Sequence, residues 1–463
     1  MKARYDLRTM LKPKSVAIIG ASRNPDKVGH IILQNYLSAG YSGKLYPINP
    51  NADEILGLRA YKSVLDIKRD SIDLAVVAIP AELTPQALND CGKAGIRNVV
   101  VVSGGFAEVG NGALQDKLKD ICDKYGIAMI GPNCLGLMDT RSRIDTLFLP
   151  SYKISRPFIG RVSFVSQSGA VGSTILDIIS SEGIGLSKFI SYGNAVCVDE
   201  VDILEYLMAD DETDVIVMYI EGIKRGKEFV EVARKLGKKK PVVILKAGRT
   251  DAGVTAAHSH TAALAGNYAT QEAIFRQFGF TVAKDLDELL DYAKIFASDP
   301  EPKGNRVSII TNGGGTGVLT TDAVASSRSL VLSQLANETR AALAKTMPAL
   351  VNVTNPLDLA GDADAKRYGD ALTAVSADEN TDILIVIALF QTPGADSKVA
   401  AELVHQKGDM DKPMVVISVG SDYTGLHKKI LESGGVPVYE SPSAAAKALE
   451  ALFEYGRFRD RKP

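Results

Sequence analysis

Two histidines lie in one segment of small residues, and imidazole is a side chain that forms covalent intermediates in catalysis. His258 and His260 are two of the five histidines in the chain. Nearly all residues of the segment 248–266 are small, with a glycine at each end. Such a segment has few side chains with which to anchor itself in a core, so we expect a mobile loop that carries a nucleophilic imidazole. An exposed histidine without a role is the alternative.

A carboxylate stands where it can support this chemistry. Glu221 directly follows the apolar run 215–220. Open α/β sheets place their sites at the carboxyl ends of their strands. A carboxylate there could hold the second ring nitrogen of His260 and stabilise a positive charge on the imidazole. The alternative is an ordinary loop acid.

A short polar segment separates the apolar run 162–165 from a predicted helix that begins near Ala170. It consists of Ser166, Gln167, Ser168 and Gly169. Hydroxyls and free backbone N–H groups at a helix N-terminus favour a bound anion. An ordinary helix cap would explain one of these serines. A nucleophilic serine is disfavoured because the pattern around Ser168 is not Gly-x-Ser-x-Gly.

A glycine-containing turn follows the first apolar run, at residues 20–29. A turn of this kind between a strand and a helix suits a phosphate group. The dinucleotide spacing Gly-x-Gly-x-x-Gly is absent, and the second predicted strand, 44–48, ends in Asn49 and Pro50 rather than in a carboxylate. A neutral end tolerates a ribose that carries its own phosphate, which favours coenzyme A over NAD. NADP, or a turn that binds nothing, is the alternative.

Other site types have little support in the sequence. The pair His258 and His260 could bind zinc or copper, but no cysteine or carboxylate cluster is near in sequence to complete a metal site. The four cysteines form no Cys-x-x-Cys pair. The glycine-rich segment 313–317 lacks the lysine of a phosphate-binding P-loop. We therefore predict no metal site and no P-loop.

The composition of the chain is that of a globular protein of about three domains. The 463 residues are 46% hydrophobic and 23% charged, with a net charge of −2. A charge so close to zero offers no basic surface for a nucleic-acid backbone. The apolar runs are too short for a signal-peptide core or a membrane span. The sequence thus predicts a cytoplasmic protein that binds neither nucleic acid nor membrane.

Runs rich in Val and Ile alternate with helical patterns, as in doubly wound α/β folds. Residues 1–140 are predicted to form one such domain. The segment 161–172 is echoed by 306–317, and two later strands are echoed in the same order. This repeat predicts two related α/β domains, 155–300 and 304–463. The second copy has Leu389 in place of Glu221 and no histidine pair, so we expect the chemistry in the first copy.

Five short motifs, in this order, carry a resemblance to a known family. They lie at residues 17–22, 131–136, 165–170, 259–266 and 355–358. Together they make the chain similar to the α subunit of the NDP-forming acyl-CoA synthetases, especially the ADP-forming acetyl-CoA synthetases, and more distantly to succinyl-CoA synthetase. The resemblance implies a Rossmann-like CoA-binding domain followed by two flavodoxin-like domains. It also implies an acid–thiol ligase that interconverts acetyl-CoA, ADP and phosphate with acetate, ATP and CoA through an acyl phosphate and a phosphohistidine.

The resemblance also implies roles for particular residues. The phosphorylated nucleophile would be His260 rather than His258, and Glu221 would stabilise the phosphohistidine. The residues implied to bind phosphate are Ser166, Gln167, Ser168 and Gly169. Those implied to bind CoA are Gly20, Ala21, Ser22, Arg23, Lys27, Asn49, Pro50, Ile79, Pro80, Ser103 and Gly104. Those implied to lie near the acyl substrate are Asn133, Gly193, Asn194 and Asp199.

The nucleotide site is expected outside this chain. Nothing in the sequence is similar to an ATP-grasp domain. The resemblance therefore implies an ATP-grasp β subunit in an α2β2 complex, which binds ADP or ATP with Mg²⁺, and no permanently bound cofactor. An NADP-linked oxidoreductase and a non-catalytic CoA-sensing protein are the alternatives that the residues leave open.

Overall fold

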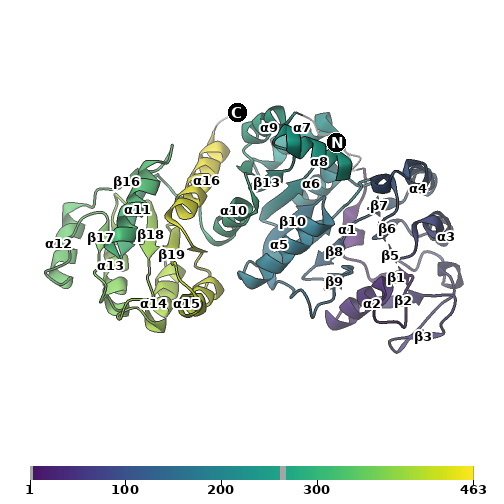
Figure 1. Cartoon of the computed structure of the whole chain (residues 1–463), viewed down its shortest axis with the longest axis horizontal. Coiled ribbons are helices and arrows are strands. Elements are labelled where there is room, and N and C mark those ends of the chain that lie inside the picture. The colour runs from purple at the N-terminus through teal and green to yellow at the C-terminus, as the bar shows by residue number, and fades with distance from the viewer. Residues whose placement is uncertain (1–3, 261–266, 462–463) are drawn as a thin grey trace. The chain divides into compact units, whose positions relative to one another are not determined.

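The computed structural model describes residues 4–260 and 267–461, and the side chains of 256–260 are left out of that description. The chain divides into two compact units, Met1–Lys284 and Asp285–Pro463 (Figure 1). Among the described residues, no helix is both long and apolar enough to cross a membrane.

The first unit contains a five-stranded parallel sheet near the N-terminus. Its strands in spatial order are β2 (Lys44–Ile48), β1 (Ser15–Ile19), β5 (Leu74–Val77), β6 (Asn98–Val101) and β7 (Ala128–Ile130). The accompanying helices are α1 (Leu7–Leu11), α2 (Val28–Ser38), α3 (Thr84–Ala94) and α4 (Gly112–Tyr125), with single turns η1 (Val64–Asp66), η2 (Ala81–Leu83) and η3 (Ala107–Val109). A small hairpin joins β3 (Glu54–Ile55) to β4 (Leu58–Arg59). Four of the five sheet strands are buried along their whole length, which is why they read as continuous apolar runs in the sequence.

The first unit also contains a seven-stranded sheet. Its strands in spatial order are β14 (Thr281–Ala283), β13 (Val242–Lys246), β12 (Val215–Ile220), β10 (Ile159–Ser166), β11 (Leu186–Ser191), β8 (Gly136–Asp139) and β9 (Ile144–Asp145). The accompanying helices are α5 (Gly169–Ser181), α6 (Glu200–Ala209), α7 (Gly226–Leu236), α8 (Asp251–His260) and α9 (Tyr268–Gln277). Strand β8 pairs with β11 in antiparallel orientation, so residues 136–145 extend this sheet rather than the N-terminal one. The sequence patterns did not indicate that β8 and β9 belong to this sheet.

The histidine segment differs from the predicted loop, and the prediction of an irregular segment is wrong over residues 251–260. Helix α8 occupies these ten positions. The Thr250 side chain accepts a hydrogen bond from Gly253 N (3.1 Å), and the Thr250 carbonyl accepts one from Val254 N (2.8 Å). The segment also contains several alanines, the best helix formers, so a run of small residues does not by itself exclude a helix. Residues 261–266 and the side chain of His260 lie outside the described part.

The second unit contains a six-stranded parallel sheet. Its strands are β16 (Val331–Leu332), β15 (Arg306–Thr311), β18 (Ile383–Ile387), β19 (Met414–Ile417) and β20 (Val438–Tyr439) in spatial order, with β17 (Leu357–Asp358) also paired to β15. Its helices are α10 (Leu286–Ser298), α11 (Gly314–Ala325), α12 (Asn337–Thr346), α13 (Ala365–Ala377), α14 (Ser397–Gly408), α15 (Asp422–Ser433) and α16 (Pro442–Asp460). The segment 298–304, where the predicted domains 155–300 and 304–463 meet, joins α10 and β15 inside this unit. The three sheets confirm the predicted α/β class.

The internal repeat is visible in matching side-chain contacts at the start of equivalent strands. Arg161 forms an ion pair with Asp214, and Arg306 forms one with Asp382. Both arginines begin or lie early in the first strand of their copy, and both aspartates directly precede the strand beside it. The same pair recurs at the same topological position, so the two copies share their packing as well as their sequence pattern.

The repeat also places Glu221 and Leu389 at equivalent positions. In the first copy, the Gln167 side-chain oxygen accepts a hydrogen bond from Glu221 N at 2.8 Å. In the second copy, the Asn312 side-chain oxygen accepts one from Leu389 N at 2.9 Å. The amide side chain after the first strand thus fixes the end of the neighbouring strand in both copies. A carboxylate stands at this position only in the first copy.

Candidate active site

A cavity of about 570 Å³ lies at the glycine turn after β1. Gly20 has φ +94°, and a Cβ there would lie 2.4 Å from Ala78 O. A Cβ on Gly29 would lie 2.0 Å from Gly20 O. Glycine is therefore required at both ends of the turn, where strand and helix backbones approach each other. We call this space the N-terminal cavity.

Nine of the eleven residues implied to bind CoA line the N-terminal cavity. They are Gly20, Ala21, Ser22, Lys27, Asn49, Ile79, Pro80, Ser103 and Gly104. Arg23 and Pro50 are not among its lining residues. Arg23 instead donates a hydrogen bond to Asn51 O at 2.9 Å. The Asn49 side chain donates to Ala21 O at 2.7 Å, so the neutral end of β2 is tied to the turn after β1.

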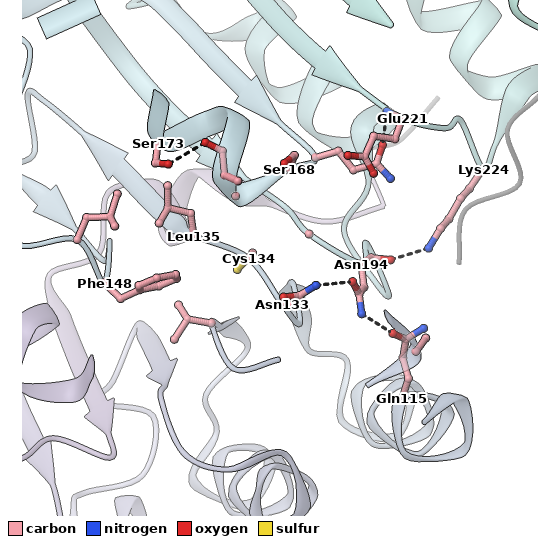
Figure 2. Close-up of a pocket in the computed structure, with 17 residues that line it drawn as sticks. Gln115, Asn133, Cys134, Leu135, Phe148, Ser168, Ser173, Asn194, Glu221 and Lys224 are labelled. Atoms are coloured by element: carbon pink, nitrogen blue, oxygen red, sulfur yellow. Dashed lines mark hydrogen bonds between the residues drawn. The ribbon is translucent and has the colours of Figure 1, made fainter. Parts of the chain in front are cut away.

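A second cavity, of about 460 Å³, lies between the start of α5 and the loops that follow β7 and β11; we call it the central cavity (Figure 2). Seven of the implied site residues line it: Gln167, Ser168, Gly169, Glu221, Asn133, Gly193 and Asn194. A Cβ on Gly193 would lie 2.2 Å from Asn133 O, so these two loops are in direct contact. Residues far apart in sequence are thus brought to one space.

The start of α5 supplies free backbone donors to the central cavity. Ser168 is the N-cap, and its hydroxyl accepts a hydrogen bond from Val171 N at 3.3 Å. Ser166 is buried and does not line the cavity; its hydroxyl donates to Ser168 O at 2.6 Å. Gly169 and Ala170 line the cavity, and the first N–H groups of a helix have no partner within the helix. This end of the cavity suits an anion.

Glu221 lies at the end of β12 in a fixed, buried position. The Gln167 side-chain oxygen accepts hydrogen bonds from Glu221 N and from Gly222 N, at 2.8 and 3.1 Å. The Glu221 side chain is 7% exposed. On the neighbouring strand, burial lowers the pKa of Lys246, and the negative charge of Glu221 acts against that shift. The carboxylate is therefore held beside the helix start with a cation nearby.

Asp199 makes contacts that stabilise the fold near the site. It is the N-cap of α6 and accepts hydrogen bonds from Val201 N and Asp202 N. The Arg225 guanidinium donates two hydrogen bonds to its carboxylate, each 2.6 Å long. Asp199 does not line the central cavity. The structure therefore separates it from Asn133, Gly193 and Asn194, with which the resemblance grouped it.

Three residues near the central cavity were missed by the sequence analysis. The Lys224 ammonium donates to Asn194 O at 2.7 Å and to Ala195 O at 2.9 Å. The Asn194 side chain donates to Gln115 at 2.9 Å and to Glu108 at 2.6 Å. Their sequence contexts are those of ordinary helix and loop residues, so no local pattern distinguishes them. Only the approach of segments about 30 to 90 residues apart brings them to the site.

The two cavities adjoin. Val102 and Phe148 line both of them. A long ligand that occupies the N-terminal cavity can therefore extend its end past these side chains toward the start of α5. Among the described residues, no group of three or more His, Cys, Asp or Glu side chains could hold a metal ion. The arrangement is that of an extended ligand site that leads to an anion site.

Family models match three consecutive parts of the chain. A CoA binding domain matches residues 14–140, a succinyl-CoA ligase like flavodoxin domain matches 159–296, and a Ligase-CoA domain matches 307–454. The order of these domains agrees with the order of the three sheets. The chain thus has the architecture of the CoA ligases.

Individual proteins of known name narrow this class. The chain is 40% identical to the alpha subunit of acetate–CoA ligase (ADP-forming) II of Pyrococcus furiosus, over 96% of this chain and 97% of that protein. It is 41% identical to an acetate–CoA ligase (ADP-forming) of Methanocaldococcus jannaschii, but spans only 63% of that protein's length. The structure is similar to the acetyl-coenzyme A synthetase 1 of Ca. Korarchaeum cryptofilum solved with phosphate and ADP, with a TM-score of 0.92, 36% identity and coverage of 98% and 97%. The chain therefore belongs to the ADP-forming acetate–CoA ligase family.

Proposed function

We propose that this chain is the α part of an acid–thiol ligase that interconverts acetyl-CoA, ADP and phosphate with acetate, ATP and CoA. The observation that carries the proposal is the junction of the two cavities at Val102 and Phe148. One cavity is built on a glycine turn that suits the phosphates of CoA, and the other on a helix start that suits inorganic phosphate. The family to which the chain belongs supports the same reaction.

The first step takes place in the central cavity. Phosphate binds at the N–H groups of Gly169 and Ala170, and the thioester of acetyl-CoA reaches it from the N-terminal cavity. A phosphate oxygen attacks the thioester carbonyl; the C–O bond forms, the C–S bond breaks, and acetyl phosphate and CoA result. The helix start stabilises the phosphate because its N–H groups and dipole are fixed before the reaction.

The second step uses the histidine. The imidazole of His260 attacks the phosphorus of acetyl phosphate; the N–P bond forms, the P–O bond to the acetyl group breaks, and acetate leaves. Glu221 hydrogen-bonds the other ring N–H and stabilises the positive charge on the ring. ADP then takes the phosphoryl group from the histidine. Mg²⁺ bound with the nucleotide balances the phosphate charge in this transfer.

The nucleotide site is supplied from outside these 463 residues. The Pyrococcus furiosus relative is named as an alpha subunit, and this chain spans 63% of the longer Methanocaldococcus jannaschii relative. Both facts favour a second part that these residues do not contain. We propose an ATP-grasp β subunit, assembled with this chain as α2β2.

The reaction is tested with the chain reconstituted with its ATP-grasp partner. ATP, acetate and CoA are expected to give acetyl-CoA with ADP and phosphate in equal amounts. Formation of AMP and pyrophosphate, or no acetyl-CoA at all, would overturn the proposal. Calorimetry on the chain is expected to detect CoA binding and no NADP binding, and the opposite result would favour an oxidoreductase.

The CoA site makes a prediction at Gly29. A Cβ there would lie 2.0 Å from Gly20 O, so Gly29→Ala must open the turn. We expect CoA to bind about 10- to 100-fold more weakly, as for other overpacked sites. Gly112→Ala is the control, because a Cβ there meets nothing within 4 Å. Equal CoA affinities for the two variants in calorimetry would contradict the placement of CoA at this turn.

A further inference from the structure

Glu108, in η3, connects the two cavities although it lines neither. One carboxylate oxygen accepts hydrogen bonds from Gly105 N at 2.6 Å and Phe106 N at 3.1 Å. The other accepts one from the Asn194 side chain at 2.6 Å. Gly105 follows Gly104 of the N-terminal cavity, and Asn194 lines the central cavity. A single carboxylate therefore holds parts of both walls.

This carboxylate is charged at neutral pH. Burial by itself would raise the pKa of Glu108, but hydrogen bonds from the Asn194 side chain and from the backbone of Gly105 and Phe106 hold it below its ordinary value. An ionised carboxylate accepts hydrogen bonds and donates none. Whatever faces Glu108 must therefore be a donor.

That requirement fixes the orientation of the side-chain amides of Asn194 and Asn133, which hydrogen-bond in series (Figure 2). Asn194 must turn its NH₂ group toward Glu108, and the same group donates to the Gln115 oxygen at 2.9 Å. The Asn194 oxygen consequently faces Asn133, whose NH₂ group donates to it at 3.3 Å. Asn194 cannot leave this position easily, because the Lys224 ammonium donates a hydrogen bond to its backbone carbonyl oxygen at 2.7 Å. The direction of each amide thus follows from the charge on Glu108.

The side-chain amide of Asn133, the last of this series, presents its oxygen to the loop that contains Ser103 and Gly104. The NH₂ group of Asn133 is committed to Asn194, so its oxygen points the other way. That oxygen lies 3.3 Å from the position that a Cβ on Gly104 would occupy. The backbone N of Asn133 donates to Ser103 O at 2.8 Å, which fixes the residue against the same loop. Gly104 and Ser103 both line the N-terminal cavity.

We propose that Glu108 is a positioning residue for acyl transfer: acting through Asn194, it turns the carboxamide oxygen of Asn133 toward Gly104, where that oxygen accepts a hydrogen bond from the thiol of CoA. This inference rests on the proposed function. The hydrogen bond orients the sulfur for attack on the carbonyl carbon of acetyl phosphate: the C–S bond forms, the C–O bond to the phosphate breaks, and the leaving phosphate takes up the thiol proton, so that acetyl-CoA and phosphate result. Asn133 then acts as an acceptor for the nucleophile and not as a donor to the carbonyl oxygen.

The test reverses the direction of the hydrogen bonds between these side-chain amides. Glu108→Gln can keep its oxygen on Gly105 and Phe106, but it turns an NH₂ group toward Asn194 and so reverses the direction of both asparagines. In the complete enzyme we expect kcat/KM for CoA, with acetyl phosphate as co-substrate, to fall about tenfold. In the Asn133→Ala variant, kcat/KM for CoA is expected to fall at least as far. Adding Asn194→Asp to Glu108→Gln restores an obligatory acceptor for Asn133, so this double variant is expected to recover most of the activity.

Two readouts separate this role from a general structural one. The amount of phosphoenzyme formed from ATP is expected to stay at the wild-type level in all of these variants, because that step does not use the thiol. Asp116→Asn is the matched control on α4; Asp116 is exposed, and we expect its loss to change neither readout. Failure of Asn194→Asp to restore activity, or an equal fall in phosphoenzyme, would overturn the inference. Absence of phosphoenzyme in the wild type would instead overturn the proposed function.

Discussion

Replacing His260 by alanine is expected to lower the overall reaction at least about a thousandfold, because the phosphoryl group then has no nucleophile to carry it to ADP. With γ-labelled ATP and the complete enzyme, the wild type should acquire a label that is stable to base and labile to acid. His260→Ala should acquire none. The step from acetyl phosphate and CoA to acetyl-CoA should persist in this variant, since the imidazole takes no part in it.

His258→Ala is the matched control for this prediction. It removes the other imidazole of the same segment, two positions away. We expect its phosphoenzyme and its overall rate to stay close to those of the wild type. Label that persists in His260→Ala and disappears in His258→Ala would move the nucleophile to residue 258. Normal turnover in both variants would rule out a histidine relay in this segment.

Replacing Lys188 by methionine is expected to lower the free energy of unfolding by about 3 to 5 kcal/mol, the usual cost of removing one partner of a buried ion pair. Lys188 lies in β11 and its side chain is 0% exposed. Its ammonium lies 3.2 Å from Asp139 and 2.9 Å from each of Asp210 and Glu212. Methionine would leave the fully buried Asp139 carboxylate without its cation.

The pH dependence of this loss has a definite sign. Burial alone would raise the pKa of Asp210, but hydrogen bonds from Thr213 and Lys188 hold it below its ordinary value. A lowered carboxyl pKa stabilises the fold above the unfolded pKa of about 3.9, and this contribution is lost as pH falls through the folded value. The difference between wild type and Lys188→Met should therefore be largest near pH 7 and shrink toward pH 3.

Urea unfolding of the full chain, with hydrogen exchange of the β11 amides to follow the first unit, measures this difference. Lys239→Met, at an exposed lysine of the same unit, is the control and should change the stability by less than about 0.5 kcal/mol. A deficit that grows toward acid pH would contradict the assignment of Lys188 as the cation that these carboxylates need.

Much of the architecture was predictable from the sequence because its cause is local. A parallel strand covered on both faces must be apolar along its length, and β1, β12 and β18 are such runs. The glycine turn at Gly20 and the polar start of α5 follow from backbone sterics and free N–H groups, which depend on residue type. The internal repeat also showed, from the sequence alone, that the second copy has Leu389 at the position equivalent to Glu221.

Local sequence did not decide two other features. Helix α8 forms where a loop was predicted, because alanines and the Thr250 cap favour a helix in a segment that lacks bulky side chains. Strand β8 joins the second sheet, where Asp139 meets Lys188 in the protein interior. The place of β8 depends on contacts between distant residues, and helix α8 depends on a balance of residue propensities. The pattern of apolar residues shows neither.

The sequence by itself determined the α/β class, the turn and helix start that suit phosphate groups, and the histidine and glutamate expected to move a phosphoryl group. Only the tertiary structure brought the two cavities together at Val102 and Phe148 and placed Glu108 beside Asn194. The physical reason is range. Turns and helix ends are set by neighbouring residues, whereas the direction of a side-chain hydrogen bond depends on a partner that the chain meets only after it has folded.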